Sequence, residues 1–124
     1  MKKIQFAFLV LVSCHAASAQ YKATEWDERD KWQKTATILK HLDLQPSMNV
    51  ADIGCHEGYL TMKISPQVPE GKVYAVDIEN YKLKKLNKRL KDEFITNVLT
   101  IHGAPDDPKL PVGSLDRVII LDLP

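Results

Sequence analysis

One short stretch limits the folds open to this chain more than any other. Residues 49–59 read N-V-A-D-I-G-C-H-E-G-Y, which predicts a buried strand that breaks at Gly54 and enters a helix near Gly58. Glycine suits such a turn because it adopts positive φ at no steric cost, and because a ligand lying against the backbone leaves no room for a Cβ atom. The stretch therefore predicts a ligand-binding loop between a strand and a helix.

Strands and helices alternate on both sides of this loop. The pattern predicts a helix at 21–43, then strands at 47–53, 72–78, 98–101 and 116–123, with helices at 59–64 and 81–94 between the first three strands. Such alternation is typical of right-handed βαβ units and a parallel sheet. We therefore predict an α/β fold: a Rossmann-like, doubly wound, mostly parallel sheet, incomplete at about four strands, with an N-terminal helix. The near-continuous apolar run at 116–123 predicts a strand buried on both faces.

The composition fits one folded domain and excludes some kinds of site. With 124 residues, 44% hydrophobic and 27% charged, the chain has the balance of a globular protein and not of a disordered one. Its two cysteines, Cys14 and Cys55, lie in an apolar leader and in the glycine loop, so we expect no disulfide between them. No cysteine and histidine cluster has the spacing of a metal site, and we predict no metal.

The first nineteen residues have the pattern of an export signal. Two lysines precede an apolar run at 4–12, and Ala17-Ser18-Ala19 resembles a cleavage site. The apolar run of nine residues is too short to span a bilayer, so we predict no transmembrane span. The predicted organisation is a signal peptide at 1–19 and a folded domain at 20–124, exported to the periplasm or secreted.

Two other interpretations of the leader stay open. Residues 11–14, L-V-S-C, also fit a lipobox, in which Cys14 would carry a lipid. If the leader is not used, the protein stays in the cytoplasm. The chain has 17 basic and 16 acidic residues, and the leader holds two of the basic ones, so the remainder is close to neutral. The charge therefore gives no strong signal for nucleic acid as a partner.

An acidic residue follows the second predicted strand at an informative distance. Asp77 lies 23 positions after Gly54, close to the offset that brings a carboxylate to the ribose hydroxyls of a nucleotide. A dinucleotide fingerprint, G-x-G-x-x-G, would also need glycines where His56 and Tyr59 stand. The spacing predicts a nucleotide ligand, and an NAD(P)-binding oxidoreductase of the Rossmann type is the weaker alternative.

The segments D-I-G-C-H-E-G-Y at 52–59 and Y-A-V-D-I-E at 74–79 together resemble the class I S-adenosylmethionine-dependent methyltransferases. The usual loop of that family is D/E-x-G-x-G-x-G. The resemblance implies an enzyme that uses S-adenosyl-L-methionine to methylate an acceptor that the sequence does not identify. It implies cofactor contacts from Asp52, Gly54 and Gly58 at the methionine and ribose end, from Asp77 to the ribose hydroxyls, and from Ile78 to the adenine.

Further residues take roles from the same resemblance. The family commonly places an acid after the third strand to contact the adenine amino group, which points to Asp106, with Asp107 as the alternate. Cys55 would pack beside the cofactor, and Glu57 would contact the methionine amine or favour the start of the helix. His56 stands where the family usually has its middle glycine. Either it tolerates that position because the backbone is ordinary there, or its imidazole helps to deprotonate a substrate. No catalytic residue is assigned.

The resemblance also predicts a truncated domain. Complete members of the family have a seven-stranded sheet, whereas this sequence ends at Pro124, directly after the fourth predicted strand. An apolar strand edge at 118–121 would then favour self-association. Three functions stay open: a methyltransferase, which as a fragment could be inactive, an NAD(P)-binding oxidoreductase, and a non-catalytic exported protein that keeps the cofactor fold.

Overall fold

A computed structural model of the protein describes residues 25–121. The predicted signal peptide, including Cys14, and the end of the predicted fourth strand lie outside these residues. The described residues fall into two compact units, which divide between residues 38 and 39, and each is described by itself. No helix among residues 25–121 has the length and apolar character needed to cross a membrane.

The N-terminal helical region is two helices, where the sequence predicts one. Residues 25–33 are helical, and α2 covers Thr35–Leu42. Lys34 lies between them with a left-handed backbone, φ 52°, and its carbonyl accepts hydrogen bonds from the N–H groups of Thr37 (2.9 Å) and Ile38 (3.2 Å). The prediction of one helix at 21–43 is therefore wrong at Lys34. A lysine carries no sequence signal for a left-handed break, unlike glycine.

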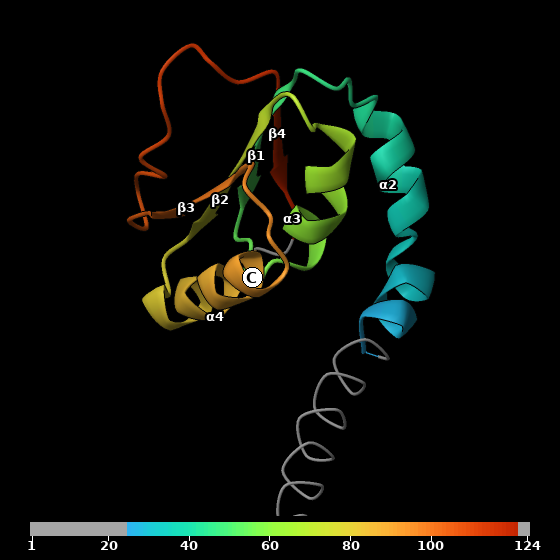
Figure 1. Cartoon of the computed structure of the whole chain (residues 1–124), viewed down its shortest axis with the longest axis horizontal. Coiled ribbons are helices and arrows are strands. Elements are labelled where there is room, and N and C mark those ends of the chain that lie inside the picture. Colours follow the sequence, from blue (N-terminus) through green and yellow to red (C-terminus); the bar gives the residue numbers. More distant parts are fainter. Residues whose placement is uncertain (1–24, 122–124) are drawn as a thin grey trace, which may run out of the picture. The chain divides into compact units, whose positions relative to one another are not determined.

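The second unit is a parallel sheet with helices, as predicted (Figure 1). The strands are β1 (Asn49–Ile53), β2 (Lys72–Asp77), β3 (Val98–His102) and β4 (Arg117–Ile120), and the helices are α3 (Tyr59–Ile64), the 3-10 turn η1 (Ser65–Gln67) and α4 (Asn80–Asp92). The four strands lie in the order β3-β2-β1-β4, and every pairing is parallel. The α/β, Rossmann-like fold class is confirmed.

The core lies between the sheet and the two helices that follow β1 and β2. Val50 and Val73 are paired across β1 and β2, and both are fully buried. Leu83, Leu86 and Leu90, at helical spacing along α4, are also buried, and α4 contacts β2 and β3. The apolar stripe of α4 therefore packs on this side of the sheet.

The other side of the sheet is less covered. The parallel register aligns Leu99, Tyr74, Ala51 and Val118 in one row, and Ile101, Val76, Ile53 and Ile120 in the next. Val118 and Ile120 are 51% and 56% exposed, whereas Ile119, which points to the opposite side, is 6% exposed. The prediction that this strand is buried on both faces is wrong for Arg117–Ile120, because β4 is at the edge of the described sheet and a loop, not a helix, joins β3 to β4.

The strand order places the site. The chain runs outward from β1 through β2 to β3 and then returns to the other side of β1 as β4. In sheets of this kind a ligand binds beyond the carboxyl ends of the strands, where the direction of winding changes. The residues that directly follow β1 and β2 therefore form the candidate site.

Candidate functional site

The β1–α3 loop is held against β2 by its own backbone. The N–H groups of Gly54 and Cys55 both donate to the carbonyl of Val76, at 2.8 and 3.0 Å. Gly54 and Gly58 have φ values of 75° and 93°, which glycine adopts without strain. At Gly58 a Cβ atom would also lie 2.4 Å from Leu86 Cδ1, so glycine is needed there for α3 to start close to α4. The predicted glycine turn is present at both positions.

His56 departs from its predicted backbone. One of the two sequence interpretations required an ordinary conformation, but His56 has φ 52°, in the left-handed region. That interpretation is wrong. A residue with a Cβ atom is strained there by about 1–2 kcal/mol, although histidine occupies the region more often than most residues do. The backbone of the loop is therefore strained at His56, where a glycine would adopt the same φ freely.

Asp77, the last residue of β2, is the centre of the site. Its side chain is buried, and each carboxylate oxygen accepts a backbone hydrogen bond. Oδ2 accepts from the N–H of His56 at 2.9 Å, and Oδ1 accepts from the N–H of Glu79 at 2.8 Å. The carboxylate also lies at the N-terminus of α4, where the helix dipole favours negative charge. The predicted proximity of Asp77 to the glycine loop is thus present, and the carboxylate is fixed in one orientation.

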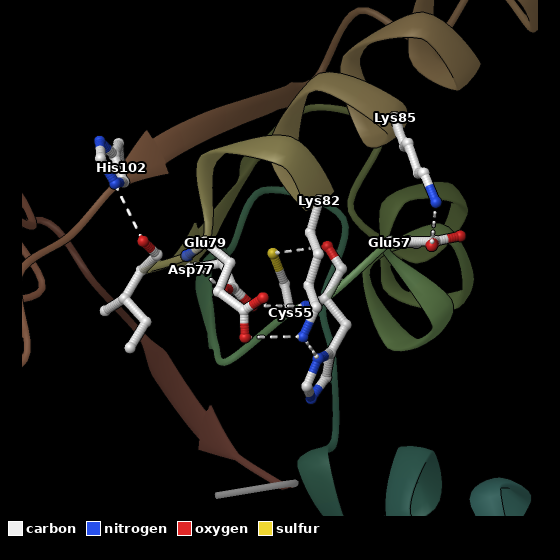
Figure 2. A network of polar contacts seen from close by, with 9 residues as sticks. Cys55, Glu57, Asp77, Glu79, Lys82, Lys85 and His102 are labelled. Carbon is white, nitrogen blue, oxygen red and sulfur yellow. Dashed lines mark hydrogen bonds and ion pairs between the residues drawn. The ribbon is translucent and has the colours of Figure 1, made fainter.

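Lys82 of α4 contacts both the β1–α3 loop and Glu79, the residue directly before α4. Its Nζ lies 2.9 Å from His56 Nδ1 and 3.1 Å from Glu79 Oε1. Figure 2 shows Lys82 between Glu79 and the loop that carries Cys55 and Glu57. Because an ammonium only donates, His56 Nδ1 is the acceptor, and a neutral His56 carries its proton on Nε2.

The charges in this cluster stabilise one another. Burial by itself would lower the pKa of Lys82, but the hydrogen bond and negative charge of Glu79, together with Tyr81 and Asp77, raise that pKa above its usual value. Hydrogen bonds from Tyr81 and Lys82 lower the pKa of Glu79. Lys82 and Glu79 were not predicted as site residues, since a lysine on an amphipathic helix is normally solvated. The spacing of three residues between them was the available signal.

Cys55 and Glu57 lie beside the loop in different settings. Cys55 is buried, and its Sγ lies 3.6 Å from the carbonyl oxygen of His56. Burial raises the pKa of the Cys55 thiol, and the charges of Asp52 and Asp77 raise it further, so the group is protonated at neutral pH. Glu57 turns toward α4, where its Oε1 lies 3.1 Å from Nζ of Lys85 (Figure 2).

The other predicted residues lie around this centre. Asp52 is 2% exposed, and its Oδ2 accepts a hydrogen bond from the Thr61 hydroxyl at 2.7 Å. Ile78 is 54% exposed directly after β2, and its carbonyl lies 3.0 Å from Nε2 of His102, whose ring Figure 2 also shows. His102 was not found from the sequence.

Asp106 and Asp107 are in the β3–β4 loop. Asp106 is exposed in a turn closed by backbone hydrogen bonds between Ala104 and Asp107. Oδ1 of Asp107 accepts a hydrogen bond from the backbone N–H of Lys109 at 2.8 Å, so this carboxylate supports its own loop. Among residues 25–121, no group of three His, Cys, Asp or Glu side chains could hold a metal ion.

These features fit a nucleoside. A fixed carboxylate at the end of β2 is a hydrogen-bond acceptor for two adjacent ribose hydroxyls, and a positive-φ loop lets a ligand approach the backbone closely. Ile78 offers an exposed apolar side chain next to that carboxylate, as a base would need. The described residues thus suit a cofactor that contains a nucleoside.

Comparison with known proteins agrees with this geometry. Residues 50–123 match the family model described as a methyltransferase domain. The demethylmenaquinone methyltransferase of Geobacillus stearothermophilus is 31% identical over 91 residues, which cover 73% of this chain and 38% of that protein. The protein-L-isoaspartate O-methyltransferase of Methanothermobacter thermautotrophicus is 35% identical over 69 residues, covering 55% of this chain and 32% of the relative.

Solved structures share the fold. A SAM-dependent methyltransferase from Aquifex aeolicus has a TM-score of 0.63 at 25% identity, and a precorrin-6y C5,15-methyltransferase from Geobacter metallireducens has a TM-score of 0.59 at 28% identity. Each similarity covers 68% of this chain and 45% of the solved chain. This chain thus spans less than half the length of the relatives it matches. The region that matches the family model contains the glycine loop and Asp77, and the chain belongs to the class I S-adenosylmethionine-dependent methyltransferase family.

Proposed function

We propose that this chain is the cofactor-binding part of an enzyme that transfers a methyl group from S-adenosyl-L-methionine to an unidentified acceptor. The observation that carries the proposal is the Asp77 carboxylate, buried and held by the N–H groups of His56 and Glu79 directly beside the glycine loop. A carboxylate fixed in this way can accept hydrogen bonds from both ribose hydroxyls without first being ordered, so less free energy is lost on binding.

The neighbouring residues take the roles that the family pattern suggests. Ile78 would pack on the adenine, and the backbone at Gly54 and Gly58 would leave space for the ribose and methionine. Asp52 is buried behind the loop with Thr61, so its charge would favour the cationic end of the cofactor from within the protein. Cys55 would contribute packing as a thiol. Asp106, in the β3–β4 loop, would contact the adenine amino group, and Glu57, which pairs with Lys85, would contact the methionine amine.

The main contribution of the protein to methyl transfer is to align the cofactor and the acceptor. The cofactor supplies an electrophilic methyl group on a sulfonium, and the transfer is an in-line displacement that needs no covalent protein intermediate. The loop and Asp77 would fix the nucleoside end, which sets the direction of the methyl group. A general base is required only when the acceptor must lose a proton.

We also propose the domain organisation and location that the sequence suggests. Residues 1–19 would act as an export signal, and residues 20–124 would form part of the cofactor-binding domain. This location conflicts with the cytoplasmic supply of S-adenosylmethionine. Fusing residues 1–19 to a reporter enzyme and measuring its export would decide whether the leader functions.

Titration calorimetry of the full chain tests the cofactor. We expect S-adenosylhomocysteine to bind and NAD not to bind. Asp77→Asn should weaken the binding of S-adenosylhomocysteine by at least about 1 kcal/mol, because a charge-assisted hydrogen bond is lost. Asp92→Asn is the matched control, since Asp92 is exposed and pairs with Lys88 at the other end of α4. Binding of NAD alone would contradict the proposal, and binding of neither would favour a non-catalytic protein.

A further inference from the structure

We infer that Lys82 is a positioning residue: by binding the His56 side chain, it holds the loop in the conformation that fixes Asp77 for the ribose. The inference rests on the proposed function for its consequence, since Asp77 is taken as the ribose acceptor. The linkage itself is a property of the chain and can be tested without any ligand. We call the side chains of Lys82, His56 and Glu79 together the lysine latch.

The conformation of His56 needs an external constraint. Its left-handed backbone, φ 52°, is unfavourable for a residue with a Cβ atom. In this conformation the His56 N–H donates a hydrogen bond to Asp77 Oδ2, at 2.9 Å. Because hydrogen bonds from the N–H groups of Cys55 and Gly58 hold the loop on either side, a change of φ at His56 would have to rotate the neighbouring peptide planes, including the one that carries this N–H. Strain of this kind persists only where surrounding contacts hold it.

Lys82 supplies a contact that holds His56. Its Nζ lies 2.9 Å from His56 Nδ1, and Glu79 Oε1, at 3.1 Å, keeps the ammonium in place. The loop is thus bound twice at one residue, through the His56 N–H to β2 and through its ring to α4. Glu79 also donates its own N–H to Asp77 Oδ1, so this residue contacts Lys82 through its side chain and Asp77 through its backbone.

Lys82 is more buried than two other lysines of α4. The side chain of Lys82 is 18% exposed, whereas those of Lys85 and Lys88, on the same helix, are 60% and 78% exposed. Exposed ion pairs contribute little, but a polar contact shielded from water is stronger. Lys85 makes a parallel contact with Glu57, one turn further along α4. The loop is therefore tied to α4 at two consecutive residues, and the less exposed tie is the one that reaches His56.

Five full-length variants separate the lysine latch from general effects. Lys82→Met and His56→Phe remove one partner each while keeping apolar bulk. His56→Asn should preserve the contact, because the asparagine Oδ1 is one bond from Cγ, as Nδ1 is in histidine, and asparagine tolerates the left-handed region. The double variant Lys82→Met with His56→Phe measures coupling, and Lys88→Met is the matched control on the same helix.

The first measurement is amide hydrogen exchange at His56 in the ligand-free chain. We expect exchange about tenfold faster in Lys82→Met and in His56→Phe at residue 56, and wild-type rates in His56→Asn and Lys88→Met. Exchange at the core residue Val50 reports whether each variant is folded. Wild-type exchange at residue 56 in a folded Lys82→Met would overturn the inference.

The second measurement is the dissociation constant for S-adenosylhomocysteine. We expect it to rise about tenfold in Lys82→Met and His56→Phe, with no further rise in the double variant, and to stay within about twofold of wild type in His56→Asn and Lys88→Met. Unchanged affinity in Lys82→Met would refute the role in positioning. If wild-type chain fails to bind this ligand, the proposed function fails, and the exchange measurement alone decides whether the lysine latch exists.

Discussion

Individual side chains at the site carry two different kinds of constraint. His56 has a strained backbone and is held by Lys82. Cys55, next to it, is buried and is affected by the negative charges of Asp52 and Asp77. The neighbouring residues of one loop therefore differ in what a substitution would change: at residue 56 the conformation, and at residue 55 the packing and the electrostatics.

Cys55 should resist alkylation in the folded chain. Burial and the nearby carboxylates raise the pKa of its thiol, so almost no reactive thiolate is present at pH 7, and the sulfur is inaccessible. We expect iodoacetamide to leave Cys55 unmodified at pH 7 and to modify it in urea, as measured by mass spectrometry of the peptide that contains it. Rapid modification of the folded chain would mean that the loop opens readily.

The same thiol makes stability depend on pH in a defined direction. The folded-state pKa lies above the ordinary value of 9.0, so the contribution of Cys55 is fully present below that value. Above it the unfolded chain loses the proton and the folded chain does not, so stability falls as the pH rises. Urea midpoints that decrease above pH 9 in wild type but not in Cys55→Ser would agree with this.

At the scale of elements, the sequence identified the order of strands and helices but not all their limits. Helix α3 was predicted with its observed bounds, and the prediction of β2 exceeded the strand by one residue, because apolar alternation and flanking glycine and proline define both. Helix α4 ends two residues early, since Phe94 adopts φ 55° and the N–H of Ile95 bonds to the carbonyl of Leu90. This is a helix-ending geometry that usually carries glycine.

Only the part of the candidate site that depends on local sequence features could be predicted. Gly54, Gly58 and Asp77 follow from strand ends and spacing, which are local features of the sequence. Lys82 and Glu79 become part of the site only when α4 packs beside the loop, and the left-handed break at Lys34 likewise has no local signal. Contacts between elements, and left-handed conformations in residues other than glycine, were beyond sequence reasoning.

Gly58 should be the most sensitive residue at the junction of α3 and α4. In Gly58→Ala the backbone would be strained at φ 93°. The new Cβ would lie 2.4 Å from Leu86 Cδ1, so the Leu86 side chain would have to move. We expect a loss of about 2–4 kcal/mol in the free energy of unfolding, measured in urea by circular dichroism. Gly113→Ala is the control: it has φ 73° but nothing within 4 Å, so only the backbone cost of about 1–2 kcal/mol applies. Equal losses would show that Leu86 adapts freely.

At the scale of the whole molecule, the less covered side of the sheet presents exposed apolar side chains in the described part of the second unit. Val118 and Ile120 lie on it at the β4 edge, and Leu99 lies on the same side in β3. An apolar strand at a sheet edge favours pairing with another chain.

We expect the isolated chain to self-associate through this surface. Ile120→Lys should shift sedimentation velocity profiles toward the monomer, because a charge at the sheet edge opposes pairing. Val112→Lys is the control, since Val112 is fully exposed in the β3–β4 loop and is not part of the sheet. Association that is equally strong in both variants would place the contact elsewhere on the molecule.

The order in which the strands pair along the chain has a consequence for folding. The hydrogen bond from Lys72 to Asn49, at the start of β1 and β2, closes 23 residues, whereas the bond from Asn49 to Asp116, next to β4, closes 67. The longer closure costs about 1 kcal/mol more in chain entropy. The β1–α3–β2 unit, which contains the glycine loop and Asp77, is therefore favoured to assemble first, and β4 to join last. The nucleoside end of the site can thus be organised while the sheet is still open.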